Sequence, residues 1–368
     1  MNRLIIIGNG FDLAHGIESS FKDFIIEYLR DSINNFFQNG DYSDILLEIK
    51  FIPPYNHFSK QPELIKADKV LELVEQYKNH SSFRLRIKSK LLERAYSKIK
   101  DYNWVDLEVE FFNLLIETKK KFIDKKKIEE INNVNSQLEY LKRKLIVYLE
   151  KQESYFSNVF DKNLLTDCFC EPIKTSELIT VKLKKNQLPE NLYFLNFNYT
   201  NTFESYIDLC RERIPTNYNY IHGTVSGVNG NPIFGFGDEL DKRYLEFEDE
   251  QNNELFKHIK SFEYLQSKNF YLLTSFLESN DFQVHIYGHS CGVSDRTMLN
   301  QIFEHENCKS IKIFYHKINE GKNDFVDKTY EISRHFKDKT MLRKKLVPLC
   351  FCREMPQPQN EYELNNVE

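Results

Sequence analysis

Glycine and proline are almost missing from the middle of this chain. Residues 62–160 contain no glycine, and Pro62 is their only proline. Both residue types interrupt regular helices, so their absence favours long helices here. The same stretch is rich in Lys, Glu, Leu and Ile, and its apolar residues recur at helical spacing. One such stripe comprises Leu138, Leu141, Leu145 and Leu149. We therefore expect three or four helices, and we assign residues 56–175 to a helical insertion.

Three further absences limit where the protein works. No apolar run is long enough to cross a bilayer, and the N-terminus lacks the basic, apolar and small-residue segments of a secretory signal. Charge is nearly balanced, with 50 basic and 55 acidic residues among 368 and a formal net charge of −5. This balance gives no general attraction to nucleic acid or to an anionic membrane. We expect a cytoplasmic protein that does not bind membranes.

The cysteines do not form a disulfide or zinc framework. There are seven, an odd number, scattered along a long chain. Two C-x-C pairs occur, at Cys168 and Cys170 and at Cys350 and Cys352, whereas zinc sites usually space their cysteines C-x2–4-C. We expect buried thiols in a reducing compartment, and no metal.

The first sixteen residues carry the strongest local signal. An apolar strand at 4–7 runs into Gly8-Asn9-Gly10; Gly16 follows, and a helical pattern begins near Ser19. In open α/β sheets such a turn lets backbone N–H groups approach a diphosphate. The spacing G-x-G-x5-G departs from the usual G-x-G-x-x-G fingerprint. A tight turn that binds no ligand is the alternative.

Strands return after residue 175 and alternate with helical patterns. The strands are expected at 192–197, 218–221, 282–287 and 310–315, with 346–351 as a fifth candidate, and the helices at 201–213, 294–306 and 324–338. This alternation predicts a mainly parallel sheet. We assign 1–55 and 176–353 to this discontinuous core, and 354–368 to a flexible polar tail.

Polar loops follow four of the predicted strands. They are Gly8–Asp12, Asn196–Thr202, His222–Gly223 and Gly288–Asp295. Ligands of open parallel sheets bind beyond the carboxyl ends of the strands. We therefore expect these four loops to share one edge of the sheet.

Two other motifs allow alternative interpretations. Trp104, Asp106 and Glu108 form a W-x-D-x-E pattern. It is either a helix start with Trp104 in the core or a lid that brings a carboxylate over a nucleotide. The segment IFGFGDE at 233–239 is either a loop that closes over a ligand, with Asp238 or Glu239 pairing to a ribose, or a simple turn.

Together these motifs resemble those of the bacterial abortive-infection AbiH family. The matching segments are IIIGNGFDLAHG, NWVDLE, LNFNYTNTFE, YIHG, IFGFGDE and IYGHSCGVSD. AbiH-like proteins are in turn distantly similar to sirtuin-like NAD-binding proteins. The resemblance implies a Rossmann-like (sirtuin-like), mainly parallel α/β fold with a large helical insertion. The AbiH resemblance also implies phage defence by stopping host growth, while the sirtuin-like similarity implies NAD as substrate.

The sirtuin-like order assigns roles to particular residues. Asn198 would orient the nicotinamide ribose and a water, and His222 would act as general base in cleavage of the nicotinamide–ribose bond. The implied nucleotide-binding residues are Gly8, Asn9, Gly10, Phe11, Asp12, Gly16, Thr200, Gly288, His289, Ser290 and Asp295. The chain departs from the pattern at Asp12, where the group has a serine, and at Thr200, where it has an acid.

Two other functions compete with NAD hydrolysis. The chain could be a nucleotide sensor without catalysis, acting through its helical insertion. It could instead be a metal-dependent nuclease using Asp12, Asp106 and Glu108. The apolar stripes of the insertion lead us to expect a homo-oligomer, and a defence role implies a phage-derived trigger or a partner defence protein.

Overall fold

The chain forms two compact units. The computed structural model describes residues 1–55, 65–156, 161–250 and 252–358. The first unit contains Met1–Glu18, Leu149–Glu250 and His258 onward; the second contains Ser19–Tyr148 and Gln251–Lys257. These units divide the chain at other positions than the predicted domains, since the second begins before helix α2 (Phe21–Asn39). Among the described residues, no helix has the length and apolar character needed to cross a membrane.

A six-stranded, wholly parallel sheet forms the centre of the first unit. Its order is β11-β8-β7-β1-β5-β6. The strands are β1 (Asn2–Ile7), β5 (Leu192–Asn196), β6 (Thr216–Tyr220), β7 (Phe282–Tyr287), β8 (Cys308–Tyr315) and β11 (Arg353–Glu354). The α/β class and four strands after β1 are confirmed. The strand order reverses at β1, between β5 and β7, where open α/β sheets bind ligands.

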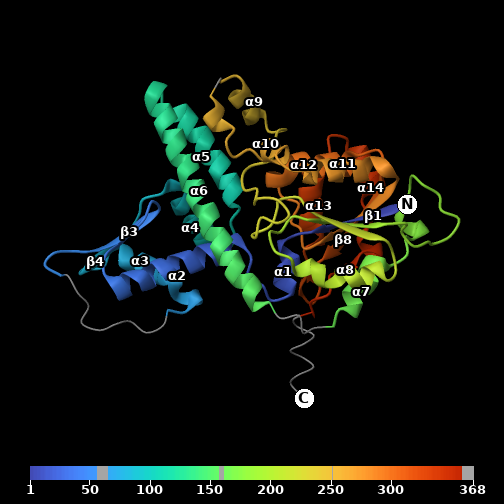
Figure 1. The fold of residues 1–368 in the computed structure, drawn as a ribbon, viewed down its shortest axis with the longest axis horizontal. Coiled ribbons are helices and arrows are strands. Elements are labelled where there is room, and N and C mark those ends of the chain that lie inside the picture. The colour runs from blue at the N-terminus through green and yellow to red at the C-terminus, as the bar shows by residue number, and fades with distance from the viewer. Residues whose placement is uncertain (56–64, 157–160, 251, 359–368) are drawn as a thin grey trace, which may run out of the picture. The chain divides into compact units, whose positions relative to one another are not determined.

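Each face of this sheet has its own apolar core, because alternate residues of a strand point to opposite faces. Leu4 and Ile6 pack with α11 (Asn269–Ser279), α12 (Arg296–Glu304) and α13 (Phe325–Arg334). On the other face, Ile5 and Ile7 pack with α7 (Asn163–Cys170) and α8 (Ile207–Arg211). Figure 1 shows α11 and α12 on one side of the sheet and α7 and α8 on the other.

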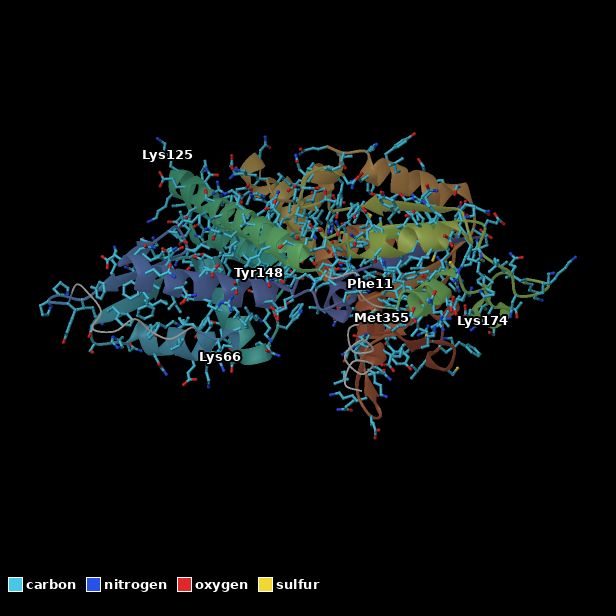
Figure 2. The ribbon with its side chains drawn as sticks, turned by 60° about the horizontal axis from the view of Figure 1, so that its bottom comes forward. Phe11, Lys66, Lys125, Tyr148, Lys174 and Met355 are labelled. Atoms are coloured by element: carbon cyan, nitrogen blue, oxygen red, sulfur yellow. The ribbon has the colours of Figure 1, made fainter. Side chains whose placement is uncertain are left out.

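The short helix α1 (Asn9–Ala14) belongs to the second of these cores. Phe11 packs there with Phe169 and Tyr206, so its ring is a core residue. Met355 lies in the same core, far away in the sequence (Figure 2). The start of the predicted tail is therefore anchored; residues 359–368 lie outside the described part of the chain.

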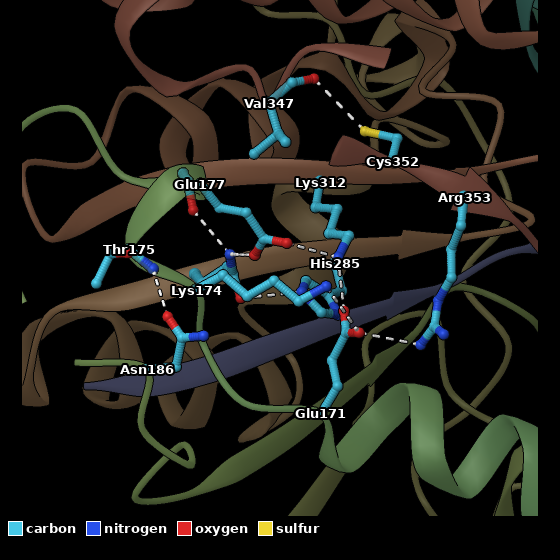
Figure 3. Close-up of polar contacts among 12 residues, drawn as sticks. Glu171, Lys174, Thr175, Glu177, Asn186, His285, Lys312, Val347, Cys352 and Arg353 are labelled. Carbon is cyan, nitrogen blue, oxygen red and sulfur yellow. Dashed lines mark hydrogen bonds and ion pairs between the residues drawn. The ribbon is translucent and has the colours of Figure 1, made fainter. Parts of the chain in front are cut away.

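A buried charged network lies on this face near the amino ends of the strands (Figure 3). Lys312 Nζ pairs with Glu171 at 2.6 Å and with Glu177 at 2.7 Å. The Arg3 guanidinium donates to the carbonyl oxygens of Phe169 and Glu171 and to Gln283 Oε1. These bonds fix the segment after α7 onto β1, β7 and β8.

The second unit contains the predicted helices and a sheet that was not predicted. The helices are α2, α3 (Val70–Lys78), α4 (Lys90–Tyr102), α5 (Leu107–Lys121) and α6 (Asp124–Tyr155, which ends in the first unit). The strands β2 (Tyr42–Ser43), β3 (Leu47–Phe51) and β4 (Phe83–Ile87) form an antiparallel sheet. Arg84 and Arg86 alternate with buried Phe83 and Leu85, a two-residue period that marks a strand.

Two other predicted elements are corrected. Residues 346–351 are not a strand: helix α14 ends at Lys345, Leu346 makes a single bridge to Ile311, and Leu349–Phe351 is a 3-10 turn. Pro348, which lacks a backbone N–H, interrupts any ladder here. The helix predicted near Ser19 is α2, with Ser20 as its N-cap, but α1 already begins directly after Gly8.

Shorter elements complete the described structure. The helical ones are η1 (Ala67–Lys69), η2 (Thr175–Glu177), η3 (Thr202–Tyr206), α9 (Lys242–Glu248), η4 (Asn253–Leu255), α10 (Lys260–Tyr264), η5 (Val293–Asp295), α14 (Lys339–Lys345) and η6 (Leu349–Phe351). The hairpin strands are β9 (Lys317–Asn319) and β10 (Lys322–Asn323).

Candidate functional site

The first and last predicted loops meet at the carboxyl edge of the sheet. The Gly10 N–H donates to the Gly288 carbonyl at 2.8 Å. A Cβ on Gly288, whose φ is +68°, would lie 2.1 Å from the Phe11 nitrogen, and one on Gly8 would lie 2.4 Å from the Cα of His289. These glycines are therefore required by close backbone packing between β1–α1 and the loop after β7.

Asn198 connects the loop after β5 to the glycine turn. Its amide Nδ2 donates to the Gly8 carbonyl at 3.0 Å. Asn196, which the sequence analysis did not select, shapes this loop: its Nδ2 donates to the carbonyl oxygens of Asn198 and Thr200. The 3-10 turn η3 has Asn201 as its N-cap, with no side-chain capping bond.

Asp12 and Thr200 lie against each other behind this turn. The Thr200 hydroxyl donates to Asp12 Oδ2 at 2.6 Å, and both side chains are buried. His15 lies nearby, with Nδ1 2.7 Å from the Phe11 carbonyl and Nε2 2.6 Å from the Tyr206 hydroxyl. Burial lowers the pKa of His15 to about 4.

His222 is buried at the end of β6 and has a partner at each ring nitrogen. Nδ1 is 3.1 Å from the Phe197 carbonyl, which can only accept, so Nδ1 carries the proton. Nε2 is 3.0 Å from the Tyr264 hydroxyl and 3.2 Å from Asp295 Oδ1. Burial, and then the charge of Lys260, lower the pKa of His222, so that its neutral form dominates at pH 7.

Asp295 lies at the centre of a buried charged cluster that also contains Lys260, His222 and His289. Lys260 Nζ lies 2.7 Å from Asp295 Oδ1, and His289 Nε2 lies 3.7 Å from Oδ2. Burial alone would raise the pKa of Asp295, but the charge of Lys260 outweighs it and holds that pKa well below its usual range. The carboxylate is therefore ionised and paired with Lys260.

His289 is a buried neutral imidazole. Its Nδ1 accepts a 2.9 Å hydrogen bond from the Cys291 N–H, so the proton lies on Nε2, toward Asp295. Burial lowers the pKa of His289 to about 3. Its ring also packs edge-on against Phe197.

The segment at 233–239 covers this cluster together with α10. The Phe236 N–H donates to the His258 carbonyl, and the Lys260 N–H donates to the Phe236 carbonyl. Asp238, predicted as a possible ribose ligand, pairs instead with Arg296 at 3.2 Å. Lys260 was not predicted because no motif in the sequence around it marks a site residue.

The other predicted site residues and the cysteines differ in how far they are exposed. Ser290 is exposed, Asn9 is half-buried in the first turn of α1, and Gly16 follows α1 with a φ of +77°. All seven cysteines are free thiols; Cys168 and Cys170 are buried, on helix α7. Across the described residues, no three His, Cys, Asp or Glu side chains are grouped so that they could hold a metal.

The W-x-D-x-E pattern begins a helix in the second unit. Asp106 is the N-cap of α5, and its Oδ1 accepts from the N–H groups of Glu108 and Val109. The helix-start interpretation is confirmed, but Trp104 is 61% exposed and so is not a core residue. Val105 and Leu107 are buried instead, because the chain turns before the helix.

Comparison with known proteins supports the resemblance of the motifs. The family model described as "Bacteriophage abortive infection AbiH" matches residues 4–317, which includes all four strand-end loops. No curated protein matches the chain. The chain therefore belongs to the AbiH family of bacteriophage abortive infection proteins.

Proposed function

We propose that the protein acts in abortive infection by hydrolysing NAD at the nicotinamide–ribose bond, with the nucleotide bound at the carboxyl edge of the parallel sheet. The observation that carries this proposal is that Asn198 and the buried His222 follow the neighbouring strands β5 and β6, with Asp295 Oδ1 3.2 Å from His222 Nε2. The residues come from loops that are far apart in the sequence and converge where a nucleotide is expected.

The sheet topology supports a Rossmann-like, sirtuin-like assignment. Numbered along the chain, the six strands lie in the order 3-2-1-4-5-6. This is the order of doubly wound dinucleotide-binding sheets, which hold their ligand at the point where the order reverses. In this chain that point lies beside β1, next to Gly8, Gly10 and Gly288.

His222 has the state that a general base requires. With its proton on Nδ1, the lone pair of Nε2 can take a proton from water. In the proposed reaction, the water oxygen bonds to the ribose C1′. The C1′–N bond breaks with its electron pair passing to the nicotinamide nitrogen, and the water's proton passes to Nε2. The products are ADP-ribose and nicotinamide, and no redox step is involved.

Asn198 and Asp295 serve different parts of this reaction. The Asn198 amide would orient the ribose and the water, while the Asp295 carboxylate places negative charge near a sugar that becomes cationic as the bond breaks. The Gly10 N–H already has an internal partner, so the turn holds the diphosphate through other groups or after a rearrangement.

The test is NAD turnover by the purified full chain, with and without phage infection products. Nicotinamide and ADP-ribose should accumulate, and His222→Gln should reduce their rate about 10²–10⁴-fold, the usual contribution of a positioned acid–base group. His316→Gln, at an exposed histidine, is the matched control and should leave the rate unchanged. Equal rates in His222→Gln and the unaltered protein would remove the assigned role.

A nucleotide sensor without catalysis is the second candidate. It is favoured by the burial of His222 and by the partners at both of its ring nitrogens. A sensor would bind NAD in calorimetry and release no nicotinamide under any condition. Homo-oligomerisation through the second unit stays a prediction, which light scattering at micromolar concentration tests.

A further inference from the structure

The proposed base cannot meet a substrate in the conformation described. The His222 side chain is 5% exposed, and Asp295 beside it is 12% exposed. Nε2 faces the Tyr264 hydroxyl at 3.0 Å, which is a full hydrogen-bonding distance. A water or a ribose can reach Nε2 only if Tyr264 moves away.

Helix α10 supplies both groups that close the cluster. Lys260 and Tyr264 are four residues apart, so they lie on one face of the helix. Lys260 Nζ pairs with Asp295 at 2.7 Å while Tyr264 contacts His222. One short element therefore occupies the carboxylate and the imidazole together, and its displacement would free both.

The loop at 233–239 is hydrogen-bonded to the start of α10 and helps to keep that helix over the cluster. Phe236 makes two backbone hydrogen bonds of 3.0 Å with the 258–260 strand-like segment. The packing leaves no room for side chains: a Cβ on Gly235 would lie 2.1 Å from the His258 carbonyl oxygen, and one on Gly237 2.7 Å from that of Ser294. Glycine at these positions permits tight closure.

The chain leading into α10 belongs to the second unit. Residues 252–257 group with that unit. There, the Asn135 Nδ2 on α6 donates to the Glu254 carbonyl at 2.8 Å, and Leu255 is fully buried. Only His258 and Ile259 separate this segment from α10. Three chain steps span at most about 10 Å, so a displacement of 252–257 passes directly to α10.

We propose that α10 is a latch that keeps His222 inaccessible in the resting protein, and that the second unit releases it by moving residues 252–257. This inference rests on the proposed function, because it concerns regulation of the same site. A protein that stops host growth needs such a closed resting state, and the latch supplies it through the Tyr264–His222 hydrogen bond and the Lys260–Asp295 ion pair.

Accessibility of His222 tests the latch without using NAD. The full chain is treated with diethyl pyrocarbonate, and the modification rate of each histidine is followed by peptide mass spectrometry. Tyr264→Phe keeps the ring and removes the hydroxyl, so the His222 rate should rise about three- to tenfold, the equilibrium value of one net hydrogen bond. Gly237→Ala, which forces the covering loop away from Ser294, should raise it as well.

The controls separate latch opening from general loosening. Tyr206→Phe removes a similar buried tyrosine–histidine hydrogen bond, at His15, and should leave the His222 rate unchanged. Exposed His316 provides the reference rate, and fully buried His285 reports global opening. If neither Tyr264→Phe nor Gly237→Ala exceeds Tyr206→Phe, the latch is refuted.

The link to the second unit has its own variant. Asn135→Ala removes the bond to Glu254 and should raise the His222 rate about two- to tenfold, although Asn135 lies outside the site. An unchanged rate would overturn the link.

If the latch variants expose His222 but no variant releases nicotinamide, the latch stands and the NAD reaction fails. If the latch holds, Tyr264→Phe also raises nicotinamide release without phage by a similar factor.

Discussion

The Thr200 hydroxyl donates a 2.6 Å hydrogen bond to the Asp12 carboxylate, which joins the loop after β5 to helix α1. The resemblance to sirtuin-like motifs led us to expect a serine in place of Asp12 and an acid in place of Thr200. The two side chains depend on each other, because the hydroxyl at position 200 donates to the buried carboxylate at position 12. The carboxylate at position 12 thus has a partner inside the protein.

Removing this hydroxyl should destabilise the first unit. Thr200→Val is expected to lower the free energy of unfolding by about 1.5–3 kcal/mol, because a buried carboxylate loses a charge-assisted hydrogen bond. Urea unfolding followed by fluorescence measures the change, and Thr200→Ser, which keeps the hydroxyl, should lose less. The exchanged double variant Asp12→Ser with Thr200→Asp should be at least about 1 kcal/mol more stable than the sum of the single changes predicts. Simple additivity would show that the pair is not coupled.

The Lys260–Asp295 pair yields a second prediction. Lys260→Met should lower the free energy of unfolding by about 3–5 kcal/mol, because it leaves a buried carboxylate without its cation. Adding Asp295→Asn to Lys260→Met should recover part of that loss, since the neutral amide needs no counter-charge. A double variant less stable than Lys260→Met in chemical denaturation would contradict this account.

A third prediction concerns the charged network under the sheet. Lys312→Met should lower the free energy of unfolding by about 3–5 kcal/mol, since the Lys312 side chain is 1% exposed and its ammonium pairs with both Glu171 and Glu177. Arg213→Met removes the solvent-exposed pair with Asp167 and serves as the control, with an expected cost below about 1 kcal/mol. Equal midpoints for the two variants in thermal and urea unfolding would show that burial of the network adds nothing to the stability of the protein.

The buried neutral histidines make stability depend on pH. The pKa of His15 is lowered to about 4 and that of His289 to about 3, while the unfolded chain has the ordinary value of about 6.5. The unfolded state therefore binds more protons, and stability rises with pH through this window. Their stabilisation is complete above pH 6.5 and is lost as pH falls toward the folded values. As the pH falls from 7.5 to 5, each of these two histidines should lower the free energy of unfolding by about 2 kcal/mol.

His15→Gln isolates one of these contributions. Glutamine does not titrate, so the variant should show about 2 kcal/mol less pH dependence over that range than the unaltered protein. His316→Gln, at an exposed position, should show the full dependence. Denaturant titrations at several pH values provide the measurement, and a pH dependence identical in His15→Gln and the unaltered protein would rule out His15 as a source.

The sequence by itself determined the parallel core and the edge at which its loops meet. Apolar strands such as Leu4–Ile7 and Leu192–Leu195 are readable because burial on both faces requires a continuous apolar run. Gly8, Gly10 and Gly288 mark the tight approach after them, since any side chain would collide with backbone. Both the apolar runs and the glycines reflect local requirements, so they can be predicted from short segments of the sequence.

Only the tertiary structure decided which polar groups are partners. Thr200 bonds to Asp12, and Lys260 pairs with Asp295, although each pair is far apart in the sequence. No motif around Thr200 or Lys260 indicates which residue its partner is. The antiparallel strands Leu47–Phe51 and Phe83–Ile87 were likewise hidden, because a strand pairs with a distant segment and its short period competes with helical patterns around it. Hydrogen bonds and ion pairs depend on distances that the topology sets, so they emerge only when the chain is folded.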